Sequence, residues 1–323
     1  MTLAPWLLEP WRQLQLRRVA DRLPHALLLA TPAGLGKRSM ATALQASLLC
    51  EAPLAEGFAC GRCRGCQLLA AGSHGDAIRV TFGYRDDGKL RTEIVVDQVR
   101  ELCARFAQTS ARGGWRIAII DPADALNHNA ANALLKTLEE PEPGVLIILV
   151  ADDMARLPAT IRSRCQRIEI AAPPRETGVA WLLAQGVPEA DAASALDLAD
   201  GNPGEALLML APEAQRMVTE LIADLSALAE GKELAPIAAR WTDENAELRL
   251  RTFARLITAS MRSASASVSP QLQRMAAITA HADFRKLSRF WDKLNWSRGQ
   301  LSSPLRSDLL ILDTLVDFRE ALG

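Results

Sequence analysis

Four cysteines lie close together early in the chain, at a spacing typical of a metal site. Cys50, Cys60, Cys63 and Cys66 follow the pattern C-x9-C-x2-C-x2-C. Four thiolates form a closed, tetrahedral structural zinc site, and gaps of two residues let a short knuckle present several sulfurs to one ion. We therefore predict structural zinc at these four residues. The alternatives are an iron–sulfur cluster or four free thiols.

A second candidate site is the stretch TPAGLGKR, which partly matches the phosphate-binding loop G-x-x-x-x-G-K-[ST]. Gly36 and Lys37 fit the template, but Thr31 replaces its first glycine. Arg38 replaces the Ser or Thr that would ligate Mg²⁺. The loop follows an apolar run and opens a helix, which is the context that favours a phosphate. We therefore predict phosphate affinity at most, without efficient hydrolysis.

The stretch IAIIDPAD has the form of the apolar strand and terminal aspartate that support Mg²⁺ in phosphate-loop ATPases. Asp121 is the aspartate. The following position, where an active ATPase has a glutamate that polarises water, is Pro122, which has no side-chain base. The candidate residues of this degenerate nucleotide site are Thr31, Gly34, Gly36, Lys37, Arg38 and Asp121.

Three arginines crowd the stretch LPATIRSRCQRIEI, at Arg162, Arg164 and Arg167. A solvated basic surface is one interpretation, since exposed charges often contribute little. The other is an arginine finger, a guanidinium that meets the γ-phosphate of a nucleotide held by a neighbouring chain, and such a residue is worth about 10³–10⁵ in rate.

Composition limits the protein classes that need to be considered. The chain has 323 residues, of which 49% are hydrophobic and 23% charged, with a net charge of −1 at pH 7. These values are ordinary for a soluble globular protein, and this charge gives no global field towards nucleic acid or anionic membranes. We find no apolar run of about 18 residues and no signal peptide. Six cysteines in a protein that is not exported are expected to stay reduced, which favours metal binding over disulfides.

Short apolar runs alternate with helical patterns in the first half of the chain. Residues 25–30, 115–121 and 145–152 predict buried strands, and residues 78–81 and 167–170 are weaker candidates. Strands that are apolar nearly throughout and are separated by helices indicate a parallel sheet covered on both faces.

The composition changes at Pro173-Pro174, which marks a linker, and no strand pattern follows it. We predict an α/β domain at residues 1–172 with a metal-binding insertion at about 50–76. A small helical domain at 173–211 and a larger one at 212–323 follow it. The last domain is predicted to hold about four amphipathic helices, with breaks at 263–270 and 302–304.

Together these motifs resemble the bacterial clamp loaders of the DNA polymerase III holoenzyme, which are AAA+ proteins. The resemblance is carried by PHALLLATPAGLGK, the cysteine knuckle, IAIIDPADALNHNAANALLKTLEEP and LPATIRSRC, and covers about residues 22–170. The stretches GNPGEAL and LSSPLRSDLLILDTLVDF agree with the family's lid and collar domains. The resemblance implies an AAA+ P-loop domain with a parallel sheet and an inserted zinc knuckle, followed by an all-helical lid domain and an all-helical collar domain.

Departures from the family pattern indicate which kind of subunit the chain resembles. The ATP-hydrolysing subunits carry a complete P-loop, an Asp-Glu pair and a lid arginine, whereas Arg38, Pro122 and Gly204 stand at these positions here. The Ser-Arg-Cys triplet, which holds a trans-acting arginine in the family, is intact. The resemblance thus implies a stator that does not hydrolyse ATP and supplies an arginine finger to a neighbouring ATPase subunit. The residues of this motif are Ser163, Arg164 and Cys165.

The resemblance also implies partners. These are the motor (gamma/tau) and delta subunits in a hetero-pentamer, with the sliding clamp and primer-template DNA contacted through the complex. It implies structural zinc, ATP and Mg²⁺ that this chain does not hydrolyse, no membrane, and a cytoplasmic location in the nucleoid-associated replisome. Two alternatives remain. One is an ATP-hydrolysing motor subunit that uses Lys37 and Asp121, and the other is a zinc-containing nucleic-acid-binding module with Arg62 and Arg64.

Overall fold

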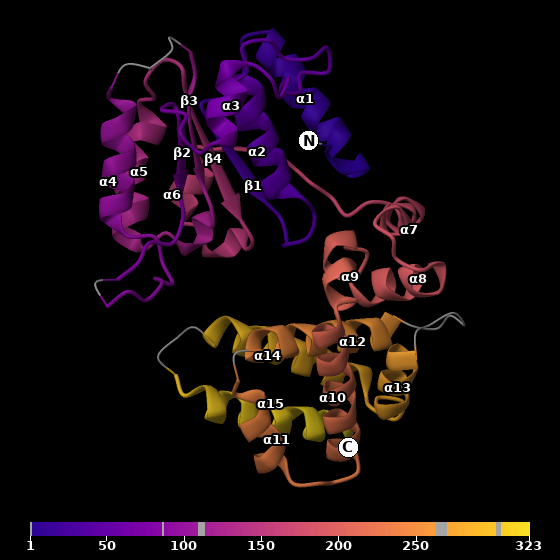
Figure 1. The fold of residues 1–323 in the computed structure, drawn as a ribbon. Helices are drawn as coiled ribbons and strands as arrows, with labels where there is room; N and C mark the ends of the chain where they lie inside the picture. Colours follow the sequence, from indigo (N-terminus) through magenta and orange to yellow (C-terminus); the bar gives the residue numbers. More distant parts are fainter. Residues whose placement is uncertain (1, 86, 109–113, 244, 263–269, 302–304) are drawn as a thin grey trace. The chain divides into compact units, whose positions relative to one another are not determined.

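A computed structural model describes residues 2–85, 87–108, 114–243, 245–262, 270–301 and 305–323. The chain divides into two compact units, an N-terminal unit at Met1–Ala172 and a C-terminal unit at Pro173–Gly323. Each unit has its own apolar core, and each is described by itself below (Figure 1). No helix among the described residues has the length and apolar character needed to cross a membrane.

The N-terminal unit is built on a five-stranded parallel sheet with the strand order β2-β3-β4-β1-β5. Every residue of the central strand β4 is buried, and its neighbours are nearly as apolar. This confirms the predicted parallel sheet. The strands are β1 (Ala26–Ala30), β2 (Ala77–Val80), β3 (Arg116–Ile120), β4 (Val145–Ala151) and β5 (Gln166–Arg167).

Helices cover both faces of the sheet, as Figure 1 shows. Alternate residues of β4 point to opposite faces, so Ile147 joins one core and Ile148 the other. Helices α4 (Val96–Phe106) and α5 (His128–Glu139) pack on the first face. Helices α1 (Leu8–Val19) and α2 (Lys37–Leu48) pack on the second. Sheet and helices together fix the strand ends, where the candidate site residues lie.

Shorter elements connect these layers. They are η1 (Pro5–Leu7), α3 (Arg64–Ala70), η2 (Ala123–Ala125), η3 (Met154–Arg156) and α6 (Ala159–Arg162). The predicted strand at residues 167–170 differs from the structure. Only Gln166 and Arg167 belong to the paired strand, although the Ile168 amide still donates to the Leu28 carbonyl of β1 over 3.0 Å.

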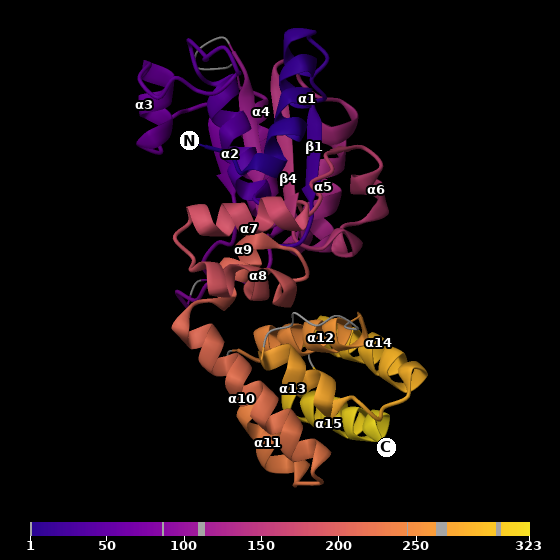
Figure 2. The same ribbon diagram turned by 90° about the vertical axis from the view of Figure 1, so that its right-hand side faces the viewer.

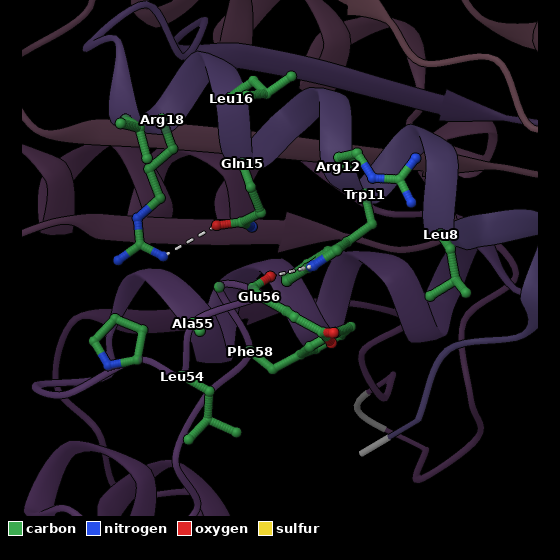
Figure 3. Close-up of a pocket in the computed structure, with 13 residues that line it drawn as sticks. Leu8, Trp11, Arg12, Gln15, Leu16, Arg18, Leu54, Ala55, Glu56 and Phe58 are labelled. Carbon is green, nitrogen blue, oxygen red and sulfur yellow. Dashed lines mark hydrogen bonds between the residues drawn. The ribbon is translucent and has the colours of Figure 1, made fainter.

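The cysteine-bearing insertion is fixed to α1 by an aromatic stack. The rings of Trp11 and Phe58 lie parallel, with centroids 4.6 Å apart, and the Trp11 indole Nε1 donates to the Glu56 carbonyl over 3.0 Å. Beside this stack, α1 and residues 53–58 enclose a cavity of about 610 Å³ (Figure 3). The insertion is therefore packed onto the α/β core through side-chain contacts.

The C-terminal unit is helical throughout its described residues. A first group, α7 (Arg175–Ala184), α8 (Glu189–Leu198) and α9 (Pro203–Met209), shares a small core. A second and larger core is formed by α10 (Pro212–Ala229), α11 (Leu234–Trp241), α12 (Ala246–Arg262), α13 (Pro270–Ile278), α14 (Phe284–Gln300) and α15 (Ser307–Leu322). Figure 2 shows the same unit from the side.

The second group has six described helices, where about four were predicted. Two breaks escaped the sequence pattern. Gly231, at a φ of 84°, follows the end of α10, and Asp283 caps α14 by accepting from the Arg285 and Lys286 amides. The predicted breaks at 263–269 and 302–304 lie outside the described residues, and Pro270 begins α13.

Phe253 is central to the larger helical core. Its side chain is fully buried and contacts the rings of Trp241, Phe290 and Phe318 at centroid distances of 6.0, 5.3 and 4.9 Å. We expect Phe253→Ala to lower the free energy of unfolding of the C-terminal unit by about 3–5 kcal/mol, because it removes a buried ring and leaves a cavity. Urea denaturation followed by tryptophan fluorescence measures this change.

Phe284→Ala is the matched control, since Phe284 begins α14 with 65% of its surface exposed. It should change the unfolding free energy by no more than about 0.5 kcal/mol. Equal losses in the two variants would contradict the assignment of Phe253 to the core.

Candidate functional site

The degenerate phosphate loop lies between β1 and α2. Gly34 and Gly36 have φ values of 96° and 86°, which glycine adopts at little cost and other residues rarely adopt. Thr31 donates its hydroxyl to the Ile170 carbonyl over 3.2 Å, so it ties the loop to the segment that follows β5. The loop thus keeps the strand–turn–helix shape of a phosphate site.

Lys37 points into the protein and has only 2% of its surface exposed. Its ammonium donates to the Thr31 carbonyl over 2.6 Å and forms an ion pair with the Asp152 carboxylate. Burial lowers the pKa of Lys37, and the hydrogen bond to Asp152 opposes that effect. The lysine that would meet a phosphate is thus engaged by a carboxylate of its own chain.

Arg38 lies between two carboxylates. Its Nε donates to both oxygens of Asp121 at 3.0 Å, and its Nη1 and Nη2 donate to the two oxygens of Asp152 at 3.2 and 2.9 Å. The pKa of Arg38 is raised, chiefly by its hydrogen bond to Asp152. Burial acts in the opposite direction, and the hydrogen bond to Asp121 raises the pKa further. Burial would raise the pKa of Asp152, but the hydrogen bonds from Arg38 and Lys37 outweigh it and lower that pKa.

These side chains form a cluster of two cations and two anions, which we call the loop cluster: Lys37, Arg38, Asp121 and Asp152. A further cation, Arg79, lies 3.9 Å from Asp121 at its edge. It occupies the carboxyl ends of neighbouring parallel strands, where a nucleotide's phosphates and Mg²⁺ lie in P-loop proteins. Asp121 directs its oxygens to a guanidinium, and the cis peptide bond to Pro122 follows it.

Asp152 was not among the predicted site residues. Asp124 positions its backbone by accepting from the Asp152 and Asp153 amides at 3.2 and 3.1 Å. The available signal was the acidic pair at the end of the strand predicted at 145–152. Strand β4 pairs with β1, so its end lies beside the loop. Sequence reasoning missed this because the ion pair joins residues 115 positions apart.

The four predicted metal-binding cysteines converge. The sulfurs of Cys50, Cys60, Cys63 and Cys66 all lie within 4.8 Å of one another, and none forms a disulfide. Backbone amides of Cys60, Cys63 and Cys66 donate to sulfurs of the cluster at 3.2–3.4 Å. Burial raises the pKa of the Cys66 thiol to about 12. Burial also acts to raise the pKa of Cys63, but hydrogen bonds from backbone amides outweigh it and lower that pKa to about 6. The cluster could hold one metal ion.

Local backbone geometry brings these sulfurs together. Cys50 follows the end of α2, and Cys63 caps α3 by accepting from the Cys66 amide. Gly61 adopts a φ of 74° in the turn between two of the cysteines. A Cβ at Gly65 would collide with the Leu49 carbonyl oxygen, so only glycine fits where α3 crosses the end of α2.

The triplet of Ser163, Arg164 and Cys165 follows α6. The Arg164 guanidinium donates to the Thr160 carbonyl over 3.0 Å and forms an ion pair of 2.6 Å with Glu139 at the end of α5. Its side chain is 35% exposed.

The neighbours of Arg164 fall into two groups. Arg162 and Arg167 are exposed. Cys165 packs against the core, where burial raises its thiol pKa to about 12. Among the described contacts, none joins Arg164 to the loop cluster. Of these three arginines, Arg164 is therefore oriented by contacts within the protein, whereas Arg162 and Arg167 are exposed to solvent.

Comparison with known proteins identifies the family to which the chain belongs. The sequence profile of the family described as "DNA polymerase III, delta subunit" matches residues 8–174, more than half of the chain. The chain therefore belongs to this clamp-loader family. It is 40% identical over 200 residues to the DNA polymerase III subunit delta′ of Pseudomonas aeruginosa, a match that covers 60% of this chain and 58% of that protein.

Two further relatives refine the assignment. The chain is 30% identical over 335 residues to the DNA polymerase III subunit delta′ of Yersinia pestis, which covers 99% of this chain and 96% of that one. Within the family, the chain belongs to the delta prime subunits. It is also 35% identical over 151 residues to the DNA polymerase III subunit tau of Escherichia coli, over 47% of this chain and 22% of that protein.

Asp152→Asn tests the loop cluster. The substitution leaves the Lys37 ammonium, which has 2% of its surface exposed, without its carboxylate. Because Asp152 itself is 39% exposed, solvent moderates the loss. We expect the unfolding free energy of the N-terminal unit to fall by about 1–3 kcal/mol, which urea denaturation measures.

The control is Asp308→Asn, which removes an ion pair to Arg306 between side chains 45% and 72% exposed; it lies in the C-terminal unit and should leave the unfolding free energy of the N-terminal unit unchanged. Because the folded pKa of Asp152 is lowered, its stabilisation is complete above its unfolded pKa of about 3.9 and is lost as the pH falls through the folded value. The difference between wild type and Asp152→Asn should therefore shrink under acid. A pH-independent difference would contradict the charge assignment.

Proposed function

We propose that this delta prime subunit is a stator of the clamp loader that does not hydrolyse ATP and acts through Arg164 on a neighbour's nucleotide. The observation that carries the proposal is the Arg38 guanidinium, which binds Asp121 and Asp152 together. A chain that fills its own phosphate loop with a guanidinium, and keeps the Ser-Arg-Cys triplet intact, fits this role better than that of a motor.

The chemistry of hydrolysis supports the proposal. Phosphoryl transfer in P-loop enzymes needs Mg²⁺ held by the loop Ser or Thr and by an aspartate. Here Arg38 replaces the first ligand and hydrogen-bonds the second, Asp121. A nucleotide would also have to displace Asp152 from Lys37. Finally, Pro122 offers no carboxylate to activate water.

Arg164 has the properties needed for a finger. Thr160 and Glu139 hold its guanidinium, but Glu139 is 49% exposed, so the ion pair is weak in water. A γ-phosphate on an adjacent subunit carries more charge than one carboxylate and accepts two parallel hydrogen bonds from a guanidinium. The phosphate would therefore compete well against Glu139. Ser163 and Cys165 would then set the position of the arginine.

In the proposed cycle, ATP on the adjacent gamma/tau motor draws Arg164 across the subunit boundary. That contact favours an assembly that binds and opens the sliding clamp. Primer-template DNA triggers hydrolysis, the arginine contact is lost and the clamp closes. The partners in this proposal are the motor and delta subunits of a hetero-pentamer, in a cytoplasmic replisome.

We also propose the domain roles and the metal. Residues 1–172 serve as the AAA+ domain, 173–211 as a lid and 212–323 as a collar that holds the assembly. The separate cores of α7–α9 and α10–α15 support the last division. The ion is zinc, since four thiolates without an open position suit a structural zinc site.

The finger is tested by Arg164→Ala in the reconstituted clamp loader. We expect ATP hydrolysis stimulated by clamp and primed DNA to fall at least about tenfold at the site that Arg164 serves, because the transition-state charge loses its guanidinium. Size-exclusion chromatography checks that the complex still assembles. Arg162→Ala removes an exposed arginine two residues away and should leave hydrolysis unchanged. Unchanged hydrolysis in an assembled Arg164→Ala complex would refute the finger.

The metal is tested by elemental analysis of the purified chain. We expect about one zinc ion per wild-type molecule and almost none in Cys63→Ala, with a lower melting temperature, because metal binding contributes folding energy. Cys103→Ala is the control, since Cys103 lies outside the cluster and its sulfur contacts Thr137. Iron with sulfide in place of zinc would establish the alternative cluster.

A further inference from the structure

Two arginines of the C-terminal unit pair with one buried carboxylate, and a third lies on a helix that packs beside theirs. Glu205 of α9 has 2% of its surface exposed. Arg251 and Arg255, one turn apart on α12, place guanidinium nitrogens 3.4 and 2.7 Å from the same Glu205 oxygen. One carboxylate is thus shared by two guanidiniums.

Arg298 of α14 is the third arginine, and no carboxylate of the described residues pairs with it. Its Nη1 donates to the Asn295 amide oxygen over 2.7 Å. Burial is the main cause of the lowered pKa of Arg298, and the positive charges of Arg251 and Arg255 lower that pKa further. The negative charges of Glu247 and Glu205 act in the opposite direction and raise it. Helices α12 and α14 pack together (Figure 2), which places Arg298 on the helix next to that of Arg251 and Arg255.

The hydrogen-bond donors of this group are incompletely used. The Nε atoms of Arg251 and Arg298 are buried and have no acceptor among the described residues. A buried donor without a partner costs about 1–3 kcal/mol. In folded proteins such donors are normally met by ordered water or an ion. Arg251 and Arg255 are 29% and 18% exposed, so an ion from solvent has access to the group.

The net charge of this group and the geometry of its guanidiniums indicate which kind of ion it would bind. Three guanidiniums stand against Glu205 and the exposed Glu247, which leaves an excess of positive charge. Guanidinium forks match the oxygens of phosphate, which accepts several hydrogen bonds at once and so suits donors that converge from two helices. A carboxylate has fewer oxygens to offer.

We propose that Arg251, Arg255 and Arg298 form a binding site for a phosphate group at the junction of α9, α12 and α14. The site is separate from the loop cluster and does not depend on the finger role of Arg164. Its ligand is free phosphate or a phosphate of a nucleic-acid backbone, and both present the same oxygens to the guanidiniums.

Calorimetric titration of the full chain with inorganic phosphate tests the site. We expect saturable binding that weakens roughly tenfold in Arg298→Gln, because one charge-assisted hydrogen bond and one charge are lost. Arg240→Gln is the control: it makes the same change at an exposed arginine of α11, which already pairs with Asp224. Circular dichroism checks that the variants fold. The loop at Lys37 could also bind phosphate, so dependence on Arg298 is the informative result.

A second variant should change phosphate affinity in the opposite direction. Glu205→Gln removes the carboxylate that competes for Arg251 and Arg255, and we expect it to tighten phosphate binding. Competition by a short DNA duplex would identify a backbone phosphate as the ligand, and its absence would identify free phosphate; either supports the site. Failure of wild type to bind phosphate saturably, equal weakening by Arg298→Gln and Arg240→Gln, or weakening by Glu205→Gln would overturn it.

Discussion

The contact between Arg38 and the carboxylates of Asp121 and Asp152 is the constraint on which the candidate site of the N-terminal unit depends. It joins the first turn of α2 to the ends of β3 and β4, so it links the loop to the centre of the sheet. Removing one member would leave charge at a partly buried position, which costs more than the contact itself contributes. The buried Lys37 depends on the same Asp152. Strand order, loop shape and side-chain charge are therefore mutually dependent at this point.

The two halves of the proposed mechanism lie in one domain but differ in how they are held. The side chains of the loop cluster are paired mainly with one another, with further contacts from Asp121 to Arg79 and from Lys37 to the Thr31 carbonyl. Arg164, by contrast, is held by a backbone carbonyl and an exposed glutamate, which leaves it able to exchange partners. A guanidinium that is already oriented loses less conformational freedom when it meets a phosphate than a fully mobile one. Under the proposed function, this difference would let a single P-loop fold lose one role and keep another.

Much of this arrangement followed from the sequence, because apolar strands and the cysteine spacing are local signals. The strands at β1, β3 and β4 were predicted since their residues are nearly all apolar, and the four cysteines converge as their spacing indicated. Contacts between distant positions were not predictable. Asp152 is 115 residues from Lys37, and the ion pairs of Glu205 with Arg251 and Arg255 depend on how helices pack. Helical periodicity shows which face of a helix is apolar, but it does not show which charged residue of a neighbouring helix will lie beside a given side chain. The short β5 was misplaced because the pairing with β1 stops at Arg167, although the Ile168 amide still donates to the Leu28 carbonyl.

The filled loop has a consequence for how such a subunit responds to the cell. In the proposed stator role, the guanidinium of Arg38 would keep nucleotide out of the loop, and a ligand that does not bind cannot shift the conformation of the domain. Its shape then stays the same whether the cell is rich in ATP or in ADP. Neighbouring subunits that do change with nucleotide would move against a surface of constant form. Under the proposed function, the loop cluster would make this chain a fixed reference in an assembly of moving parts, and the energy state of the cell would be read elsewhere.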